Sequence, residues 1–376
     1  MAEITKNQIV VITIEDMGTD GEGIGRYEGY TLFVKGAVPG DVIRAKVLKA
    51  KKTYGYAKIE EMLVSSPDRV TPCCPVAGRC GGCQLQQLSY QKQLAYKEQK
   101  VKNCLQRISG LSEQMLDSVM ESILGMDEPY YYRNKAQYPV GMGRDSGPVI
   151  GFYAGHSHTI IEQADCAIQE PINSVILKTV RDFMKEYQIP AYEEESGRGL
   201  VRHILTRVGY VTKEVMVCLV LHGRKFPYAE KLTERLKQAV EGFSAESAQG
   251  KEYMQKMEYG NVWEAGVPLK YSLKSICLNV NMERTNVILG KEILPVYGEP
   301  YITDEIGGIK YQISPLSFYQ VNPKQTVRLY EKALEYADLS GNEVVWDLYC
   351  GIGTISLFLA KQAKWAYGVE IVPQAI

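Results

Sequence analysis

The 376-residue sequence lacks several features that would define a narrow class of protein. It contains no unbroken apolar run of the length that a membrane span requires. Its first six residues show no basic segment followed by an apolar one, so no secretory signal is predicted. Its formal net charge is only -1, so total charge predicts no partner. We therefore expect a cytoplasmic protein with no membrane partner, whose 45% hydrophobic residues suffice for several cores.

The sequence has nine cysteines, and this odd number argues for metal ligands and free thiols rather than a disulfide framework. Three close thiols and one remote thiol predict a single four-thiolate site. Its ligands are Cys74, Cys80, Cys83 and Cys166. The paired glycines before the third thiol allow the tight turn that two ligands of one centre require. Spacing alone fits an iron-sulfur cluster and a tetrahedral zinc site equally. Cys73, next to Cys74, is not needed as a ligand.

The first 65 residues alternate β-branched runs with glycine-rich turns. Strands are expected at residues 9–14, 30–34 and 41–48, and five such strands predict a barrel resembling an oligonucleotide-binding fold. Residues 44–58 contain basic and aromatic side chains and no acid, a combination that suits RNA phosphates and bases. The alternative is a solvated edge strand whose lysines block aggregation. The predicted RNA contacts in this stretch are Arg44, Lys46, Lys49, Lys51, Lys52, Tyr54 and Tyr56.

The middle of the sequence mixes helical and strand-like patterns. Residues 94–108 repeat apolar side chains at helical spacing and predict a helix that faces a core. Helices at 172–187 and 228–240, with strands at 215–221 and 276–280, predict an α+β domain. Polar residues 244–259 predict a surface excursion. Arg133 and Lys135 follow three tyrosines and either contact RNA or simply lie on a strand, and the same alternatives apply to Arg202-His203.

The C-terminal part carries the clearest enzymatic pattern. A buried strand at 344–349, a glycine turn at 350–354, a helix at 355–362 and a strand at 365–369 predict the first β-α-β unit of a nucleotide-binding sheet. Glu370 ends the second strand, where an acid can accept hydrogen bonds from both ribose hydroxyls. The short glycine motif favours S-adenosylmethionine over a dinucleotide. The residues of this pattern are Asp347, Gly351, Gly353 and Glu370.

Another helix is expected just upstream of this unit. Asn322 is a suitable cap and Pro323 suits the first turn. Gln320, immediately before that helix, either hydrogen-bonds a ligand or stabilises its loop.

Two resemblances to known families narrow these predictions. Residues 21–26 and 32–41 look like a TRAM domain, an RNA-binding barrel of RNA-modifying enzymes. The second resemblance rests on this barrel, the four cysteines, the segment 314–322 and the motif at 347–355. With these features the chain closely resembles the iron-sulfur-containing uracil-C5 methyltransferases of large-subunit ribosomal RNA. The resemblance implies a [4Fe-4S] cluster rather than zinc, a ribosomal RNA partner and a monomer. It also implies cofactor contacts from Gln320, Tyr349 and Glu370, with Thr354 at a position that the family varies.

The resemblance implies three parts: a barrel domain at 1–65, an α+β iron-sulfur domain at 66–285 and a partial Rossmann-like methyltransferase domain at 286–376. In the family a cysteine thiolate adds to C6 of uracil before C5 takes the methyl group. That cysteine (Ser-Cys-Asn-Pro), an Asp-Pro-Pro-Arg segment and the base follow the second strand, whereas this sequence stops at Ile376. Cys350 lies in the cofactor turn and does not match the nucleophile.

We therefore predict a methyltransferase by descent whose 376 residues transfer no methyl group themselves. The alternative is a non-catalytic RNA-binding iron-sulfur protein. A radical S-adenosylmethionine enzyme is disfavoured because the spacing from Cys74 to Cys80 is too wide for its three-cysteine motif.

Overall fold

The computed structural model describes residues 4–143, 147–163, 165–244, 246–247, 250–251 and 270–373. The chain forms two compact units, Met1–Asp127 with Tyr153–His158 and Glu128–Phe152 with Thr159–Ile376. Among the described helices, none combines the length and apolar character needed to traverse a bilayer. The predicted excursion at 244–259 lies mostly outside the described residues. The three-part division at residues 65/66 and 285/286 stays a prediction.

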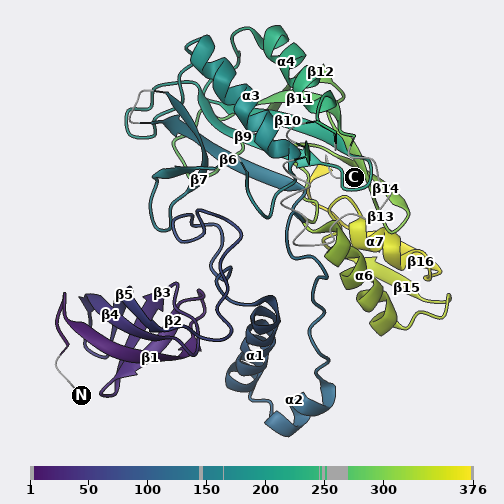
Figure 1. The fold of residues 1–376 in the computed structure, drawn as a ribbon. Coiled ribbons are helices and arrows are strands. Elements are labelled where there is room, and N and C mark those ends of the chain that lie inside the picture. Colours follow the sequence, from purple (N-terminus) through teal and green to yellow (C-terminus); the bar gives the residue numbers. More distant parts are fainter. Residues whose placement is uncertain are drawn as a thin grey trace. The chain divides into compact units, whose positions relative to one another are not determined.

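Five strands of the first unit close into a barrel, as the sequence predicted (Figure 1). They are β1 (Ile9–Met17), β2 (Gly23–Tyr27), β3 (Tyr30–Lys35), β4 (Val42–Ala50) and β5 (Tyr54–Val64). Their order around the barrel is β1-β2-β3-β5-β4, and β3 runs parallel to β5. Side chains alternate between the interior and the outer surface: Leu32 and Val34 are fully buried, whereas Phe33 between them is only partly covered.

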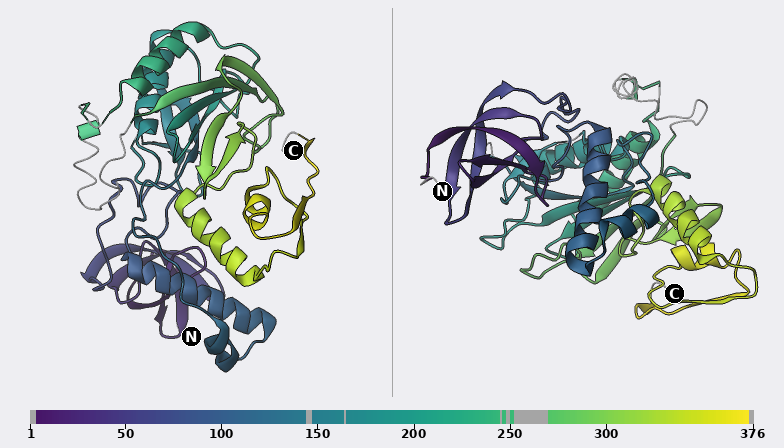
Figure 2. Two further views of the ribbon diagram at one scale, coloured as in Figure 1. Left: turned by 90° about the vertical axis from the view of Figure 1, so that its right-hand side faces the viewer. Right: turned by 90° about the horizontal axis from the view of Figure 1, so that it is seen from below.

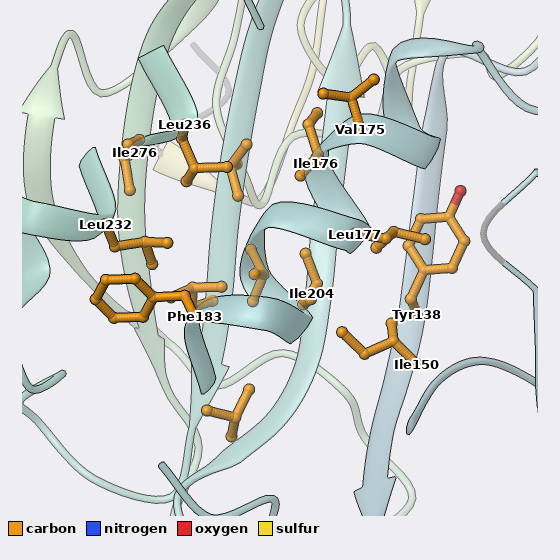
Figure 3. Packing of buried hydrophobic residues seen from close by; sticks show 14 of the residues in the cluster. Tyr138, Ile150, Val175, Ile176, Leu177, Phe183, Ile204, Leu232, Leu236 and Ile276 are labelled. Carbon is orange, nitrogen blue, oxygen red and sulfur yellow. The ribbon is translucent and has the colours of Figure 1, made fainter. Parts of the chain in front are cut away.

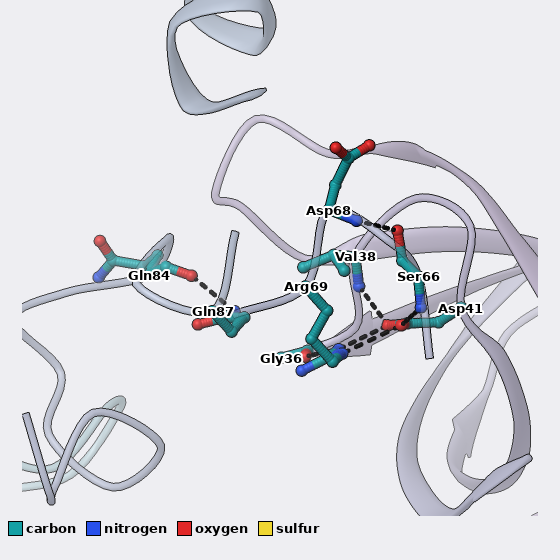
Figure 4. Close-up of polar contacts among 8 residues, drawn as sticks. All are labelled: Gly36, Val38, Asp41, Ser66, Asp68, Arg69, Gln84 and Gln87. Carbon is teal, nitrogen blue, oxygen red and sulfur yellow. Dashed lines mark hydrogen bonds and ion pairs between the residues drawn. The ribbon is translucent and has the colours of Figure 1, made fainter. Parts of the chain in front are cut away.

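A buried carboxylate fastens the segment after the barrel to the barrel itself (Figure 4). Asp41 is fully buried and accepts hydrogen bonds from the backbone N–H groups of Val38 (2.8 Å) and Ser66 (3.0 Å). Arg69 donates to the same carboxylate from Nε (3.0 Å) and from Nη2, and Nη2 also donates to the Gly36 carbonyl at 2.8 Å. This ion pair therefore holds residues 66–69 against the turn between β3 and β4.

Two helices complete the first unit, α1 (Tyr90–Ser109) and α2 (Glu113–Val119). The prediction that the first of them faces a core is wrong, because no residue of α1 is buried. It contacts the barrel through two hydrogen bonds, from the Tyr96 hydroxyl to the Gly18 carbonyl and from Lys100 Nζ to the Thr19 carbonyl at 2.9 Å, and the partly buried Tyr96 packs against the small cluster of Met17, Val38 and Leu88. Helical spacing of apolar residues predicted the helix correctly but not what covers it.

The second unit is built on a seven-stranded sheet (Figures 1 and 2). Its strands are β6 (Lys135–Met142), β7 (Pro148–Tyr153), β8 (Ile160–Glu162), β9 (Val201–Val208), β10 (Glu214–Leu221), β11 (Ser272–Val280) and β12 (Glu292–Gly298). They are ordered β12-β11-β10-β9-β6-β7-β8, with β10 and β11 parallel.

One face of this sheet carries α3 (Ile172–Glu186) and α4 (Ala229–Glu241). Ile176 and Phe183 of α3 and Leu236 of α4 point toward strand residues such as Ile204 and Ile276 (Figure 3). These five side chains expose at most 2% of their surface, so the sheet and both helices share one close-packed core. The predicted α+β arrangement is confirmed here.

The opposite face supports the C-terminal elements. A hairpin of β13 (Ile302–Ile306) and β14 (Ile309–Ile313) is followed by α6 (Pro323–Ala337), β15 (Val344–Asp347), α7 (Thr354–Leu359) and β16 (Trp365–Gly368). Tyr311, Tyr330 and Phe358 from this group pack in one apolar cluster with Met216 of β10. The cluster fixes the hairpin, α6 and α7 to the sheet.

β15 and β16 are parallel and joined by α7, which confirms the predicted β-α-β unit. The prediction of a buried first strand is wrong: Trp346 is 60% exposed and stacks on Tyr367 with ring centroids 4.7 Å apart. Within the described residues this sheet has two strands, and the paired side chains of Val344 with Trp365 and of Trp346 with Tyr367 are all exposed.

Candidate functional site

The turn between β15 and α7 brings backbone N–H groups close to two carboxylates. Gly351 and Gly353 adopt positive φ angles of 54° and 78°, a region that glycine enters without a steric penalty. Gly353 donates its N–H to the Cys350 carbonyl at 2.8 Å and begins α7. The tight turn leaves its outer surface without bulky side chains, which is what a nucleotide-like cofactor needs for a close approach.

Asp347 is the last residue of β15, and Glu370 lies two residues after the end of the adjacent parallel strand β16. Asp347 accepts hydrogen bonds from the Ser356 hydroxyl at 2.6 Å and the Tyr349 N–H at 3.3 Å. Glu370 accepts from the N–H groups of Val372 and Gly351, each at 2.9 Å. These N–H groups, Val372 first, lower the pKa of Glu370. The carboxylate is therefore fixed in its ionised, hydrogen-bond-accepting form beside the glycine turn.

Tyr349 and Thr354 lie at the two ends of this turn in different surroundings. The Tyr349 side chain is 92% exposed and available to a ligand. The Thr354 hydroxyl lies 2.8 Å from the Tyr330 hydroxyl. The backbone carbonyl of Thr354 accepts a hydrogen bond from the Tyr311 hydroxyl at 3.2 Å. Thr354 thus docks α7 on the hairpin and on α6.

Gln320 lies in the segment before α6, where the predicted cap is confirmed: Asn322 Oδ1 accepts from the Gln325 N–H at 3.2 Å. Asn134 clamps this segment, since its Nδ2 donates to the Gln320 carbonyl (3.0 Å) and its N–H to the Val321 carbonyl (3.1 Å). Buried Arg207 donates from Nη2 to the carbonyls of Pro315 (3.4 Å) and Ser317. The backbone of Gln320 is therefore held rigidly on the sheet.

Cys350 has the environment of a packing residue. A β-carbon at position 368 would lie only 2.8 Å from the Cys350 sulfur, so the thiol fills the space that Gly368 leaves open. Its pKa is raised by burial and then by the carboxylates of Asp347 and Glu370. A raised pKa disfavours the thiolate, which is the nucleophilic form.

Three of the four predicted metal ligands, Cys74, Cys80 and Cys83, lie in one segment of the first unit. The side chain of Gln86 lies among them: its Oε1 accepts from the Cys74 N–H at 3.4 Å and lies 3.9 Å from the Cys73 sulfur. The pKa of Cys83 is raised, first by burial and further by the neighbouring thiols, while a hydrogen bond with Gln86 opposes the shift. Cys80 accepts a hydrogen bond on sulfur from the Gly82 N–H at 3.3 Å.

The fourth predicted ligand belongs to the other unit. Cys166 lies before α3, near the fully buried Tyr138. No group of three or more metal-ligating side chains is gathered closely enough to hold an ion in the part of the chain that the structure describes.

The basic stretch 44–58 occupies β4, the following turn and β5. The stretch itself contains no acidic residue, but β5 continues into Glu60 and Glu61. Two of its basic side chains are therefore paired: Arg44 with Glu61 at 2.5 Å and Lys58 with Glu60 at 3.3 Å. Lys51 donates to the Tyr54 hydroxyl at 2.7 Å. The predicted contacts without a described acidic partner are Lys46, Lys49, Lys51 and Lys52, beside the rings of Tyr54 and Tyr56.

Lys135 begins β6 directly opposite Arg207 of β9, in the same sheet as the clamp on Gln320. The pKa of Lys135 is lowered to about 8 by burial and by repulsion from Arg207 and Arg133. Arg202 and His203 are buried in β9, and burial followed by Arg202 lowers the pKa of His203 to about 4. A buried, neutral His203 favours the interpretation that this histidine simply lies on a strand and does not contact RNA.

Sequence reasoning missed four residues that organise these sites. Asn134 and Arg207 were not singled out because strand patterns do not reveal contacts to a distant loop. Gln86 follows the cysteine motif by three residues, and Phe33 precedes the basic stretch on a neighbouring strand. The available signals were proximity to the cysteine motif for Gln86 and, for Phe33, its place in the segment 32–41 that resembles a TRAM domain.

Several known proteins are similar to this chain. Residues 4–59 match the TRAM domain family. Over 375 residues the chain is 45% identical to an uncharacterized RNA methyltransferase of Halalkalibacterium halodurans, covering 100% of this chain and 74% of that protein. It is 42% identical over 374 residues to one of Clostridium tetani, covering 99% and 73%.

The fold is similar to the crystal structure of the Pyrococcus abyssi tRNA (uracil-54, C5)-methyltransferase in complex with S-adenosyl-L-homocysteine. The TM-score is 0.64 at 24% identity, covering 93% of this chain and 70% of that one.

Proposed function

The chain belongs to the RNA methyltransferases. From this premise we propose that it takes part in the transfer of a methyl group from S-adenosylmethionine to C5 of a uridine in RNA. The observation that carries the proposal is the glycine turn flanked by Asp347 and Glu370 at the carboxyl ends of parallel strands. The Pyrococcus relative, which binds S-adenosyl-L-homocysteine and acts on a tRNA uracil, supports the choice of cofactor and base.

The residues of this turn suit S-adenosylmethionine, which supplies a methyl group from its sulfonium. We assign the ionised carboxylate of Glu370 as the acceptor for the ribose hydroxyls, and the exposed ring of Tyr349 as the surface for the adenine. Gln320, held by Asn134, offers a side-chain amide from the neighbouring segment. Asp347 holds Ser356 and the turn itself, so we assign it a positioning role.

Isothermal titration with S-adenosyl-L-homocysteine tests the cofactor site. Glu370→Gln removes the charge but keeps an acceptor, and we expect affinity to fall about tenfold because charge-assisted hydrogen bonds are lost. Glu343→Gln is the matched control, since Glu343 accepts from backbone N–H groups in the exposed turn before β15. Equal affinities for both variants and the unmodified chain would contradict the assignment.

Methylation at uracil C5 requires a thiolate that adds to C6, because C5 alone is too weak a nucleophile. The surroundings of Cys350 do not favour this role. By the family resemblance the nucleophile lies in a Ser-Cys-Asn-Pro segment, which the 376 residues do not contain. We therefore expect these residues alone to release no tritium from C5-tritiated uridine in RNA. Release by them, lost in Cys350→Ser, would overturn that expectation.

The RNA substrate that we propose is large-subunit ribosomal RNA, on the family resemblance, whereas the Pyrococcus relative acts on tRNA. Crosslinking of the chain to total bacterial RNA, followed by sequencing of the bound fragments, distinguishes these substrates. Enrichment of ribosomal fragments supports the proposal, and enrichment of tRNA contradicts it. RNA binding without turnover, even after a Ser-Cys-Asn-Pro segment of the family is appended to the chain, would favour the second candidate, a non-catalytic RNA-binding protein, which the barrel lysines support.

We further propose that Cys74, Cys80, Cys83 and Cys166 bind one [4Fe-4S] cluster. The support is the thiolate chemistry of the motif: the Gln86 side chain hydrogen-bonds the Cys74 N–H and Cys83, and Cys80 accepts the kind of N–H···S hydrogen bond that stabilises cluster sulfur. Anaerobically purified protein should contain iron and sulfide and show broad visible absorption. Cys80→Ser should lose both, whereas the control Cys73→Ser should keep them. Stoichiometric zinc without sulfide would overturn the proposal.

A further inference from the structure

Three adjacent strands of the barrel, β4, β5 and β3, align two rows of outward side chains. In the register, Lys49 of β4 lies opposite Tyr56 of β5, and Tyr56 lies opposite Phe33 of β3. A second row lies two residues further along β5 and β3 and three residues along β4, where the pairing register shifts between Val47 and Lys49. This row consists of Lys46, Lys58 and Lys35. Side chains two apart on a strand point to the same face, roughly 6.6 Å from each other. An aromatic row and a lysine row thus run side by side.

Phe33 and Tyr56 of the first row form an aromatic platform together with Tyr54, which lies two residues before Tyr56 on β5. Phe33 and Tyr56 have centroids 5.8 Å apart with planes inclined by 35°, while Tyr54 stands nearly perpendicular to both, at 88° and 79°. Lys51 covers Tyr54, with Nζ 4.7 Å from the ring centroid. Tyr56 is 40% exposed and Phe33 is partly exposed. Two rings inclined to each other by 35° are therefore at least partly accessible to solvent.

The charges beside this platform are predominantly positive. Of the lysine row, only Lys58 has a described acidic partner, an exposed contact with Glu60, while Lys35 and Lys46 have none among the described residues. The next ion pair along β4 and β5, Arg44 with Glu61, ends the basic surface. The surface is thus complementary to a chain of phosphates with adjacent flat groups.

Protection of a sheet edge does not explain these lysines. Edge strands use lysine to prevent pairing with other chains. β5, however, lies between β3 and β4 in a closed barrel, so its backbone is paired on both sides. Nor do the rings fill a core, since the interior of the barrel is occupied by Leu32, Val34 and Ala57 from the same strands.

We propose that the outer face of β4, β5 and β3 binds an unpaired segment of RNA, with bases stacked on Phe33 and Tyr56 and phosphates on Lys35 and Lys46. The inference rests on the proposed RNA function and specifies single-stranded RNA for this surface. In a duplex both faces of a base are covered by its neighbours, so only unpaired bases can stack on a protein ring.

The test measures binding of the full chain to a single-stranded RNA dodecamer containing 2-aminopurine, across a salt series, and to the same sequence as a duplex. The ring variants are Phe33→Leu and Tyr56→Leu, which keep apolar bulk, and the charge variant combines Lys35→Gln with Lys46→Gln. Tyr228→Leu, an exposed ring of the second unit, is the control. Hydrogen exchange of β3 and β5 checks that each barrel is folded.

We expect each ring variant to bind the single strand about tenfold more weakly, with an unchanged salt slope and less quenching of 2-aminopurine. The charge variant should reduce the slope by roughly 1.4, because each phosphate contact with a single strand contributes about 0.7. Duplex binding should not respond to the ring variants. If folded ring variants bind the single strand like the unmodified chain while the charge variant has a smaller salt slope, base stacking on the platform is refuted, but RNA binding by the barrel is supported. If the unmodified chain binds no RNA, the proposed function itself fails.

Discussion

Among single residues, Asp41 shows how a polar side chain can hold a fold together. Its burial alone would raise the pKa of the carboxyl, but hydrogen bonds from Arg69, Val38 and Ser66 outweigh that effect, and the pKa lies below its ordinary value. The folded barrel therefore prefers the ionised form. The stability that this preference provides is present above pH 4 and is lost as pH falls through the lowered pKa.

We predict that Asp41→Asn destabilises the barrel by about 3 kcal/mol at pH 7, because Arg69 loses the partner of a buried ion pair. Hydrogen exchange of barrel amides, measured between pH 3 and 7, provides the free energies of opening. The difference between the unmodified chain and the variant should shrink toward pH 3. A difference that is independent of pH would show that ionisation of Asp41 contributes nothing.

Lys135 provides a second residue-level prediction, since its pKa of about 8 lies within an accessible range. If it contacts an RNA phosphate, affinity should be full below pH 8 and fall by about fivefold as the lysine loses its proton at higher pH. Lys135→Gln should remove this dependence, whereas Lys178→Gln, an exposed lysine of α3, should keep it. An identical pH profile in Lys135→Gln would exclude the contact.

The sequence identified residue types more successfully than their partners. The run from Arg44 to Lys58 contains no acid, yet the fold brings Glu61 onto Arg44 across two strands. Conversely, the exposed platform includes Phe33, which lies on another strand and outside that run. Local sequence determines which side chains share a strand, whereas cross-strand register depends on how the whole barrel closes.

At the level of elements, the segment 314–322 is a loop that the sheet holds in place. Its carbonyls accept hydrogen bonds from Arg207 of β9 and from Asn134, directly before β6. Two strands that are distant in sequence thus position the residue that we assign to the cofactor, Gln320. Loops that carry function are commonly fixed to a rigid scaffold in this way.

We predict that Asn134→Ala weakens S-adenosyl-L-homocysteine binding about tenfold, because the Gln320 carbonyl loses its side-chain donor and the segment becomes less ordered. Hydrogen exchange in residues 316–322 should accelerate while α6 stays protected. Asn342→Ala, in the exposed turn before β15, serves as the control. Accelerated exchange without weaker binding of S-adenosyl-L-homocysteine would show that order in this loop does not affect the cofactor site.

The elements themselves were largely predictable. Asn322 and Pro323 correctly predicted the start of α6, and the glycines at 351 and 353 the turn before α7. The same reasoning failed for the surroundings of α1 and β15, which are amphipathic or apolar in sequence but exposed in the structure. Periodicity reports the conformation of a segment, and only tertiary contacts determine its burial.

For the whole molecule, a net charge of -1 means that any strong salt dependence of RNA binding must come from a local surface. We predict that replacing Lys49, Lys51 and Lys52 together with glutamine lowers the salt slope by roughly 2. The control replaces three exposed helix lysines of the second unit and changes the net charge equally. These are Lys178, Lys231 and Lys237. Equal slopes for both triple variants would exclude the barrel surface.

The exposed face of β15 and β16 also determines what can be learned about this protein by optical spectroscopy. Trp346 and Trp365, 60% and 61% exposed, are two of its three tryptophans, and Trp263 lies outside the described residues. Their emission should be red-shifted and readily quenched by acrylamide. The described barrel and seven-stranded sheet contain no tryptophan, so unfolding of either can proceed without a direct change in this signal. The emission of Trp346 and Trp365 therefore reports on the β-α-β unit, and circular dichroism is needed to follow the barrel and the seven-stranded sheet.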